Sequence, residues 1–116
     1  MLHFETQEFD CPSLPNSGIN MDNAFLQMLN DARGIAGIPF NITSGYRTKD
    51  RNKLVGGVAN SSHLVGKAAD IKVQSGNERY IIINALIKAG FKRIGVAKTF
   101  IHCDNDETKP NSIWTY

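Results

Sequence analysis

Cysteine is scarce in this chain of 116 residues, which contains only Cys11 and Cys103. Neither cysteine belongs to a CxxC pair, so a zinc knuckle built from cysteines is excluded. The two thiols lie far apart in the sequence, and in a reducing cytosol we expect them to be free rather than joined in a disulfide. The length sets a further limit, because a chain of this size forms one domain around one core and is too short for two.

Strong charge imbalance and long apolar runs are absent as well. The 13 Lys and Arg residues nearly balance the 11 Asp and Glu residues and are spread along the chain, so nucleic acid is not expected as a partner. No apolar run is long enough to span a membrane, and the opening segment MLHFETQEFD has neither the basic nor the apolar region of a signal peptide. We therefore expect a monomer that is made in the cytoplasm and has no membrane partner.

What the chain does contain is a mixture of helical and strand patterns that predicts a small α+β domain. Apolar residues at helical spacing predict one helix capped by Asn20 or Asp22 and ending near residues 34–37, and a second over residues 77–90 with Asn77 as its cap. Period-two alternation and turn signals predict five strands, of which the third and fourth form a hairpin and the last lies at an edge: residues 38–44, 68–75, 93–97, 100–104 and 112–116. Polar stretches predict loops at residues 11–18 and 47–62. Together these elements predict two main helices packed on a mainly antiparallel sheet.

Three residues could form a metal site: His63, Asp70 and His102. Strand alternation turns Asp70 away from its apolar neighbours and places His102 and Asp104 on one face of a later strand. A catalytic zinc site uses three protein ligands drawn from His, Asp and Glu and leaves a fourth position open. The alternative is that both histidines are satisfied by ordinary hydrogen bonds and that Asp70 is a surface carboxylate.

The segment SSHLVGKAAD at residues 61–70 resembles the SxHxxGxAxD signature of the zinc D-alanyl-D-alanine carboxypeptidases and their relatives among phage endolysins. Its fixed positions are Ser61, His63, Gly66, Ala68 and Asp70. The segments SGYRT, AGFKRIGV and FIHCD are similar to further parts of the same family, so that the resemblance extends from about residue 9 to residue 116 and is strongest to the compact, single-domain members.

The resemblance implies a hedgehog/D-Ala-D-Ala peptidase-like fold in which His63, Asp70 and His102 bind Zn²⁺. It also implies that Arg47 steadies the substrate or the developing negative charge, as a fixed guanidinium can do. The expected function is zinc-dependent hydrolysis of peptide bonds in peptidoglycan stem peptides, of the D,D-carboxypeptidase or endopeptidase (endolysin) type. The expected source is a phage or prophage product that is released to the cell wall, or a virion-associated one. The alternative is a catalytically weak or inactive zinc-binding module that recognises wall peptide.

One departure from the family pattern concerns the general base. Many of these enzymes carry a carboxylate three residues before the second histidine, where this chain has Thr99, which cannot accept a proton from water. Asp104 is the natural replacement, and compact relatives carry a similar His-x-Asp arrangement. Asp104 could equally orient His102 through its second nitrogen, a role that metal-binding histidines commonly need. Three other carboxylates are poorer candidates because they are expected to be solvated in polar loops: Asp50, Asp106 and Glu107.

Several remaining residues are expected to be structural. Ser61 and Ser62 are expected to hold the loop that presents His63, and Gly66 to let the backbone turn close to the metal. Trp114 and Tyr116 could line a substrate cleft, but aromatic residues near a terminus more often close a core, and we expect that role here. His3, near the amino end, is not expected to be a ligand.

Overall fold

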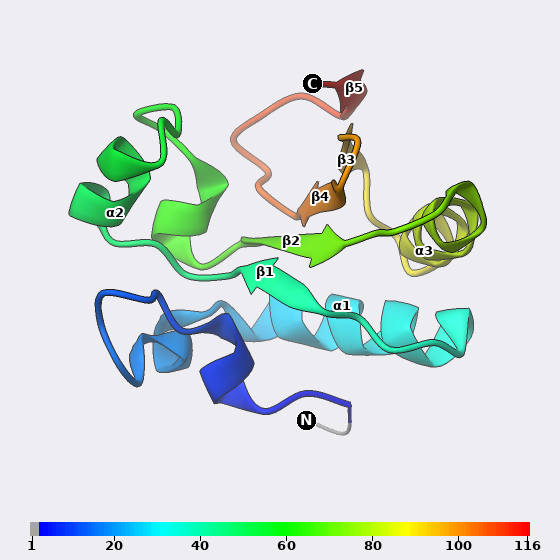
Figure 1. The fold of residues 1–116 in the computed structure, drawn as a ribbon, viewed down its shortest axis with the longest axis horizontal. Helices are drawn as coiled ribbons and strands as arrows, with labels where there is room; N and C mark the ends of the chain where they lie inside the picture. The colour runs from blue at the N-terminus through cyan, green and yellow to red at the C-terminus, as the bar shows by residue number, and fades with distance from the viewer. Residues whose placement is uncertain (1–2) are drawn as a thin grey trace.

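The computed structural model describes residues 3–116 and contains one five-stranded sheet (Figure 1). Its strands in sheet order are β1 (Ile42–Ser44), β2 (Ala68–Lys72), β4 (Phe100–Asp104), β3 (Arg93–Val96) and β5 (Ser112–Thr115). All neighbours are antiparallel except β3 and β5, which run parallel. The predicted α+β class, the hairpin of β3 and β4 and the final edge strand are therefore confirmed.

Three α-helices accompany the sheet: α1 (Asn23–Ala36), α2 (Lys49–Leu54) and α3 (Gly76–Lys88). Figure 1 shows α1 running along one side of the sheet, with α2 and α3 at opposite ends of the molecule. The chain also forms three short 3-10 turns. Two of them, Thr6–Phe9 and Ser17–Asn20, precede α1, and the third, η3 (Ser62–Val65), precedes β2. In the part of the chain that the structure describes, no helix is long and apolar enough to cross a membrane.

Helix α1 follows the pattern read from the sequence. The carboxylate of Asp22 accepts a hydrogen bond of 2.9 Å from the Phe25 amide, which makes Asp22 rather than Asn20 the cap. The helix ends at Gly37, whose φ of 69° is the left-handed conformation that glycine adopts without strain. Between these ends, the buried positions lie on the face that packs against the sheet and α3: Phe25, Leu26, Leu29 and Ala32.

The cap of helix α3 lies two residues earlier than predicted, because it is Ser75 and not Asn77. The Ser75 hydroxyl accepts a hydrogen bond of 3.1 Å from the Glu78 amide, and the Glu78 carboxylate accepts one of 2.8 Å from the Gln74 amide. A serine followed three positions later by a glutamate satisfies two free amides at once, which a cap at Asn77 could not do.

The loop predicted at residues 47–62 is wrong in part, since it contains helix α2. The Thr48 hydroxyl caps this helix by accepting a hydrogen bond of 3.1 Å from the Arg51 amide. Asn52 is the only residue of α2 that is buried, so the helix has no apolar stripe that a periodicity search could detect.

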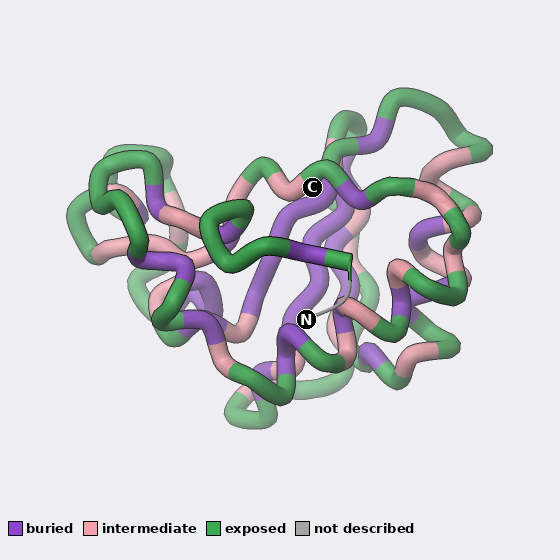
Figure 2. The backbone as a smooth tube through the Cα atoms, turned by 90° about the horizontal axis from the view of Figure 1, so that it is seen from below, coloured by how far each residue is buried: buried purple, intermediate pink, exposed green. Residues whose placement is uncertain are grey.

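The core lies between the sheet and the pair α1 and α3. Alternate residues of the central strands point into it, and Figure 2 shows buried backbone concentrated along these strands. The strand residues of the core are Ala69, Ile71, Ile94, Ile101 and Cys103. Both cysteines are buried free thiols, as expected. The other face of the same strands carries the polar residues that form the candidate site.

Candidate metal centre

A single row of paired residues crosses all five strands and carries the centre of the site. Its members in sheet order are Ser44, Asp70, His102, Gly95 and Trp114. Residues that face each other across neighbouring strands project to the same side of the sheet, about 4.5–5.5 Å apart. Asp70 and His102 are therefore brought together by the pairing of β2 with β4, on the face opposite the core.

His63 reaches this row from the 3-10 turn η3. The Ser61 hydroxyl caps the turn by accepting a hydrogen bond of 3.3 Å from the His63 amide. The His63 ring is buried and its Nδ1–H donates to the Gly45 carbonyl over 2.7 Å, which turns Nε2 toward Asp70. Gly66 ends the turn with φ of 70°. The sequence predicts that this glycine lets the backbone turn close to the metal, but the atom that a Cβ at Gly66 would meet is the Asn20 carbonyl oxygen.

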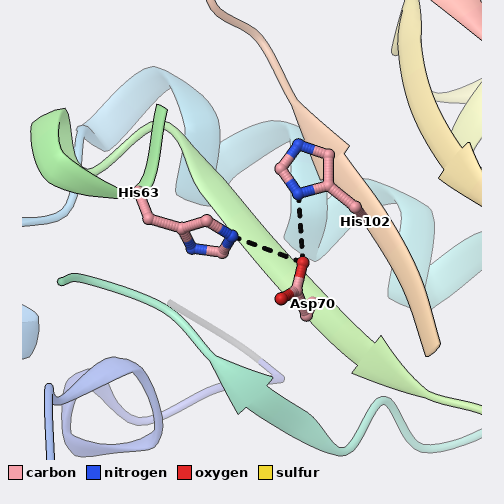
Figure 3. A group of neighbouring side chains, drawn as sticks. All are labelled: His63, Asp70 and His102. Atoms are coloured by element: carbon pink, nitrogen blue, oxygen red, sulfur yellow. Dashed lines mark hydrogen bonds and ion pairs between the residues drawn. The ribbon is translucent and has the colours of Figure 1, made fainter. Parts of the chain in front are cut away.

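The three expected ligands converge on one point (Figure 3). The Oδ1 atom of Asp70 lies 3.3 Å from His63 Nε2 and 3.0 Å from His102 Nδ1. All three ligand atoms lie within 4.8 Å of one another, and no other group of three or more His, Cys, Asp or Glu residues meets this condition among residues 3–116. His3 lies elsewhere, where its amide donates to Asn30 on α1.

The geometry of this group fits a zinc ion. Two imidazole nitrogens and one carboxylate oxygen are a donor set typical of catalytic zinc, with a fourth position left open. Ligand atoms bound tetrahedrally at about 2.0–2.2 Å lie about 3.3–3.5 Å from one another. The two separations from Asp70 Oδ1, 3.3 and 3.0 Å, are close to this, and the two histidine nitrogens lie within 4.8 Å of each other. Each histidine also has a hydrogen-bond partner on its other nitrogen, which fixes the ring and its tautomer.

The charged groups around His102 shift the pKa values of both Asp70 and His102. Burial alone would raise the pKa of Asp70, but hydrogen bonds from His102 and His63 outweigh it and hold that pKa well below its usual range. Burial would lower the pKa of His102, but hydrogen bonds to Asp104 and Asp70 raise it above its ordinary value. The His102 ring thus lies between two carboxylates, with one nitrogen facing each of them, and this environment favours positive charge.

Asp104 lies on the side of the His102 ring away from Asp70. Its Oδ2 accepts a hydrogen bond of 2.7 Å from His102 Nε2, and its Oδ1 accepts one of 2.8 Å from Arg93 Nε and one of 3.1 Å from the Asp106 amide. The side chain is 1% exposed. Despite burial, the hydrogen bond with His102 and the charges of His102 and Arg93 lower its pKa, so that it is a weak proton acceptor. Of the two roles left open by the sequence, this geometry favours the orientation of His102.

Arg47 reaches the centre from the loop after β1. Its Nη2 lies 3.6 Å from Asp70 Oδ2, its Nε donates to the Ser44 hydroxyl over 3.3 Å, and its Nη1 donates to the Asn52 side-chain oxygen over 3.1 Å. Asn52 in turn donates from Nδ2 to the Val58 carbonyl over 2.9 Å. Helix α2 thus holds the guanidinium beside the metal-binding group, where sequence reasoning had expected only a loop.

A cavity of about 540 Å³ opens over this group. Trp114 and Tyr116 line it, which corrects the expectation that they close the core. Asp70 and Asp104 are the only carboxylate side chains among its lining residues within the described chain, and Thr99 lies outside it. Asp50 and Glu107 are exposed, as expected.

A second polar network beside the cavity was missed from the sequence. Asp106 was expected to be solvated but is 6% exposed, and its carboxylate accepts hydrogen bonds from Ser62 at 2.7 Å and Thr108 at 2.6 Å. Lys109 Nζ donates to the Ser62 hydroxyl over 2.9 Å. No local pattern signals the contacts with Ser62, which is far away in the sequence. Arg93, by contrast, could have been found, because the predicted hairpin places it directly opposite Asp104.

A family model described as Peptidase M15 matches residues 2–104, which include the three candidate ligands but not β5. No curated protein matches the chain.

Proposed function

Since the chain belongs to the peptidase M15 family, we propose that it is a zinc-dependent peptidase that cuts peptide bonds in the stem peptides of bacterial peptidoglycan, as a D,D-carboxypeptidase or an endopeptidase. The observation that carries this proposal is the convergence of His63, Asp70 and His102 on one point at the floor of a cavity. The resemblance of residues 61–70 to the carboxypeptidase and endolysin signature supports the choice of substrate.

Different residues of the chain would have different roles in such a reaction. His63, Asp70 and His102 would hold the ion, while the Gly45 carbonyl and Asp104 keep the two rings in place. When bound, zinc supplies a Lewis acid for the scissile carbonyl and activates water at neutral pH. The Arg47 guanidinium, held beside Asp70, places fixed positive charge where the carbonyl oxygen becomes negative.

The role of Asp104 is a further part of the proposal. We assign Asp104 the positioning of His102, because its oxygens already accept hydrogen bonds from His102, Arg93 and the Asp106 amide. The competing assignment, Asp104 as general base, requires it to exchange one of these partners for water.

A second candidate function is a zinc-binding module that recognises wall peptide without cutting it. It is favoured by one observation: among residues 3–116, each carboxylate lining the cavity already has a partner, Asp70 within the candidate ligand group and Asp104 behind His102.

Digestion of purified peptidoglycan, with mass spectrometry of the fragments, separates the two functions. The peptidase is expected to contain one zinc per chain and to release fragments with new amino ends, which also identify the bond that is cut. Chelation should abolish release, and so should the Asp70→Asn variant, which cannot supply the same carboxylate ligand. Stoichiometric zinc without any cleavage would overturn the peptidase proposal and leave the binding module.

We further propose that the protein acts on the wall as a phage or prophage lysin, or within a virion, and does so as a monomer. The resemblance to compact endolysins supports this. Lysis of permeabilised but not intact bacteria by added protein, together with a monomeric mass in solution, is the expected result, and a dimer or an absence of lysis would contradict it.

A further inference from the structure

Cationic residues occur along the whole chain, but positive charge predominates in one segment, residues 47–67, which contains helix α2 and the turn η3. This segment has five Lys and Arg residues and one carboxylate, Asp50, and so a net charge of +4. The rest of the chain has eight Lys and Arg residues against ten Asp and Glu residues, a net charge of −2. The cations of the segment are Arg47, Lys49, Arg51, Lys53 and Lys67.

Most of these cations are not neutralised by the fold. Among residues 3–116, Arg47 is the only one of the five that forms an ion pair, with Asp70. Lys49 and Lys53 are exposed and lie four residues apart on α2, so they project from the same side of the helix. Their charges are therefore available to a partner of opposite sign.

Exposed aliphatic side chains lie directly beside these cations. Leu54 is 75% exposed, and Val55 and Val58 follow it at 48% and 65%. They lie on a tight turn in which the Gly57 amide donates to the Asn52 carbonyl over 2.8 Å. Figure 1 shows α2 and this turn at one end of the molecule. We call residues 49–58 the α2 tip, which combines unpaired positive charge with apolar surface that gains free energy when it is covered.

We propose that the α2 tip docks on the surface of a membrane rich in anionic lipid, with Lys49 and Lys53 against the headgroup phosphates and Leu54 beneath them. Such a surface uses both features of the tip, because anionic headgroups attract cations and the layer below them takes up aliphatic side chains. A soluble acidic polymer would use only the cations, and an apolar protein groove only the aliphatic side chains. The inference goes beyond the proposed peptidase and does not depend on it. It revises the expectation of no membrane partner, which was drawn from the absence of a long apolar run.

Docking through the α2 tip would also hold the cavity next to the membrane surface. Val55 and Val58 are lining residues of the cavity over the candidate metal centre. The tip is attached firmly to that centre, because the Asn52 side chain donates to the Val58 carbonyl over 2.9 Å and accepts a hydrogen bond of 3.1 Å from Arg47. The docked protein would therefore present its open cavity close to the lipid headgroups.

The test is cosedimentation of the protein with lipid vesicles. One set consists of phosphatidylcholine alone, and in the other about a third of the lipid is the anionic phosphatidylglycerol. The Lys49→Gln/Lys53→Gln variant removes two cations from the tip, and Leu54→Ser removes its most exposed aliphatic side chain. All three positions are exposed, so the variants should fold, which thermal unfolding checks.

Matched control variants lie at the opposite end of the molecule, on α3 and the turn beside it (Figure 1). Lys88→Gln/Lys98→Gln removes the same charge from two exposed positions. Ile87→Ser removes an aliphatic side chain that is 52% exposed. These variants match the tip variants in net charge and in lost apolar surface.

The wild type is expected to bind the anionic vesicles at least about tenfold more tightly than the neutral ones, and less tightly as salt is added. Lys49→Gln/Lys53→Gln should weaken this binding by roughly 30-fold, about fivefold for each cation, and Leu54→Ser by about tenfold. The variants on the side of α3 should stay within about twofold of the wild type, because these positions lie away from the docked surface.

Several results would overturn the docking proposal. They are equal binding to both kinds of vesicle, no binding to either, or the same loss in the α3 controls as in the tip variants. Binding of soluble poly(glycerol phosphate) that depends on the two lysines but not on Leu54, without vesicle binding, would replace the membrane by an acidic polymer.

Digestion of peptidoglycan by the same variants separates docking from the peptidase. The tip variants should digest purified, lipid-free peptidoglycan like the wild type, since Lys49, Lys53 and Leu54 do not line the cavity. Vesicle binding that depends on the tip, in a protein that cuts no peptide, would support docking and overturn only the proposed peptidase.

Discussion

Among single residues, Asp104 has the contacts that most constrain its role. If it positions His102, Asp104→Asn should weaken zinc binding by roughly 10–100-fold and leave kcat within about tenfold once zinc is saturating. A general base would give the opposite pattern, with zinc affinity retained and kcat lowered by roughly 10²–10⁴-fold. We expect the first pattern, measured by zinc competition and by kcat at several zinc concentrations.

Asp106→Asn is the matched control for that experiment. It removes a nearby buried carboxylate whose side chain contacts Ser62 and Thr108 rather than His102, and should leave zinc affinity within about threefold. A comparable loss of zinc in both variants would point to general damage of the segment and contradict the positioning role.

Asp106 also gives a prediction for acid stability. Burial would raise its pKa, but hydrogen bonds from Thr108 and Ser62 outweigh this and lower the pKa from 3.8 to about 2. Because the folded protein holds the carboxylate in its charged form, the stabilisation is complete above about pH 4 and is lost as the pH falls through about 2. Asp106→Asn should therefore lower the free energy of unfolding by about 1–2 kcal/mol at pH 7, with a difference that shrinks toward pH 2 in urea titrations. A difference that does not change with pH would contradict this cause.

Single residues also show where prediction from the sequence succeeds and where it stops. The signature at residues 61–70 singles out His63 and Asp70, and strand alternation singles out Asp70 and His102. The positions of Asp106 and Trp114 could not be predicted, since Asp106 is buried by Ser62, far away in the sequence, and Trp114 faces the cavity because of the strand that it pairs with. Local patterns carry no information on either contact.

At the scale of elements, the turn η3 depends on the residue that ends it. Gly66→Ala would place a side chain at φ of 70° and a Cβ 2.4 Å from the Asn20 carbonyl oxygen, a backbone atom that cannot move freely. We expect a loss of about 3 kcal/mol or more in the free energy of unfolding, measured in urea. Zinc binding should weaken with it, because the turn positions His63.

Gly76→Ala is the control for this substitution. Its added Cβ would have open space around it at the first position of α3, and the backbone there is not left-handed. The expected change is within about 1 kcal/mol and can be stabilising, because alanine restricts the unfolded chain. Equal losses at both glycines would contradict the explanation from backbone conformation.

The elements that sequence patterns identified best are those with an apolar stripe, α1 and α3. Helix α2 was missed because its stability comes from a cap and from Asn52, whose partners are Arg47 and Val58. The shift in the start of α3 has a similar cause, since Ser75 and Asn77 are both good caps and only the contact of Glu78 with Gln74 distinguishes them.

For the whole molecule, the candidate ligands connect three parts of the fold. His63 lies on η3, Asp70 on β2 and His102 on β4, so an ion bound by all three stabilises the folded chain over the unfolded one. At a free zinc concentration about 100 times the Kd, the gain is about 2.7 kcal/mol, or roughly 10 °C in Tm. Thermal unfolding with and without chelator should show this shift.

His63→Ala is the matched protein for the chelator experiment. With one ligand missing, its Tm should hardly respond to chelation. A wild-type Tm that is equally insensitive would contradict a bound ion that connects these elements.

Sheet topology was predicted only in part. The hairpin of β3 and β4 follows from a short turn, but the antiparallel pairing of β2 with β4 and the parallel pairing of β5 with β3 have no local signal. This pairing decides that Trp114 and Tyr116 line the cavity, which is why their role was mispredicted.

The row of paired residues that crosses the five strands also makes the candidate site depend on strand register. A slip of one residue between β2 and β4 would place Ile101 or Cys103 opposite Asp70 and turn His102 toward the core. Such a misassembled copy could still be compact, but it would bind no ion through these residues and would be inert toward peptide. Only molecules in which β2 and β4 have the observed register therefore bring Asp70 and His102 together with His63.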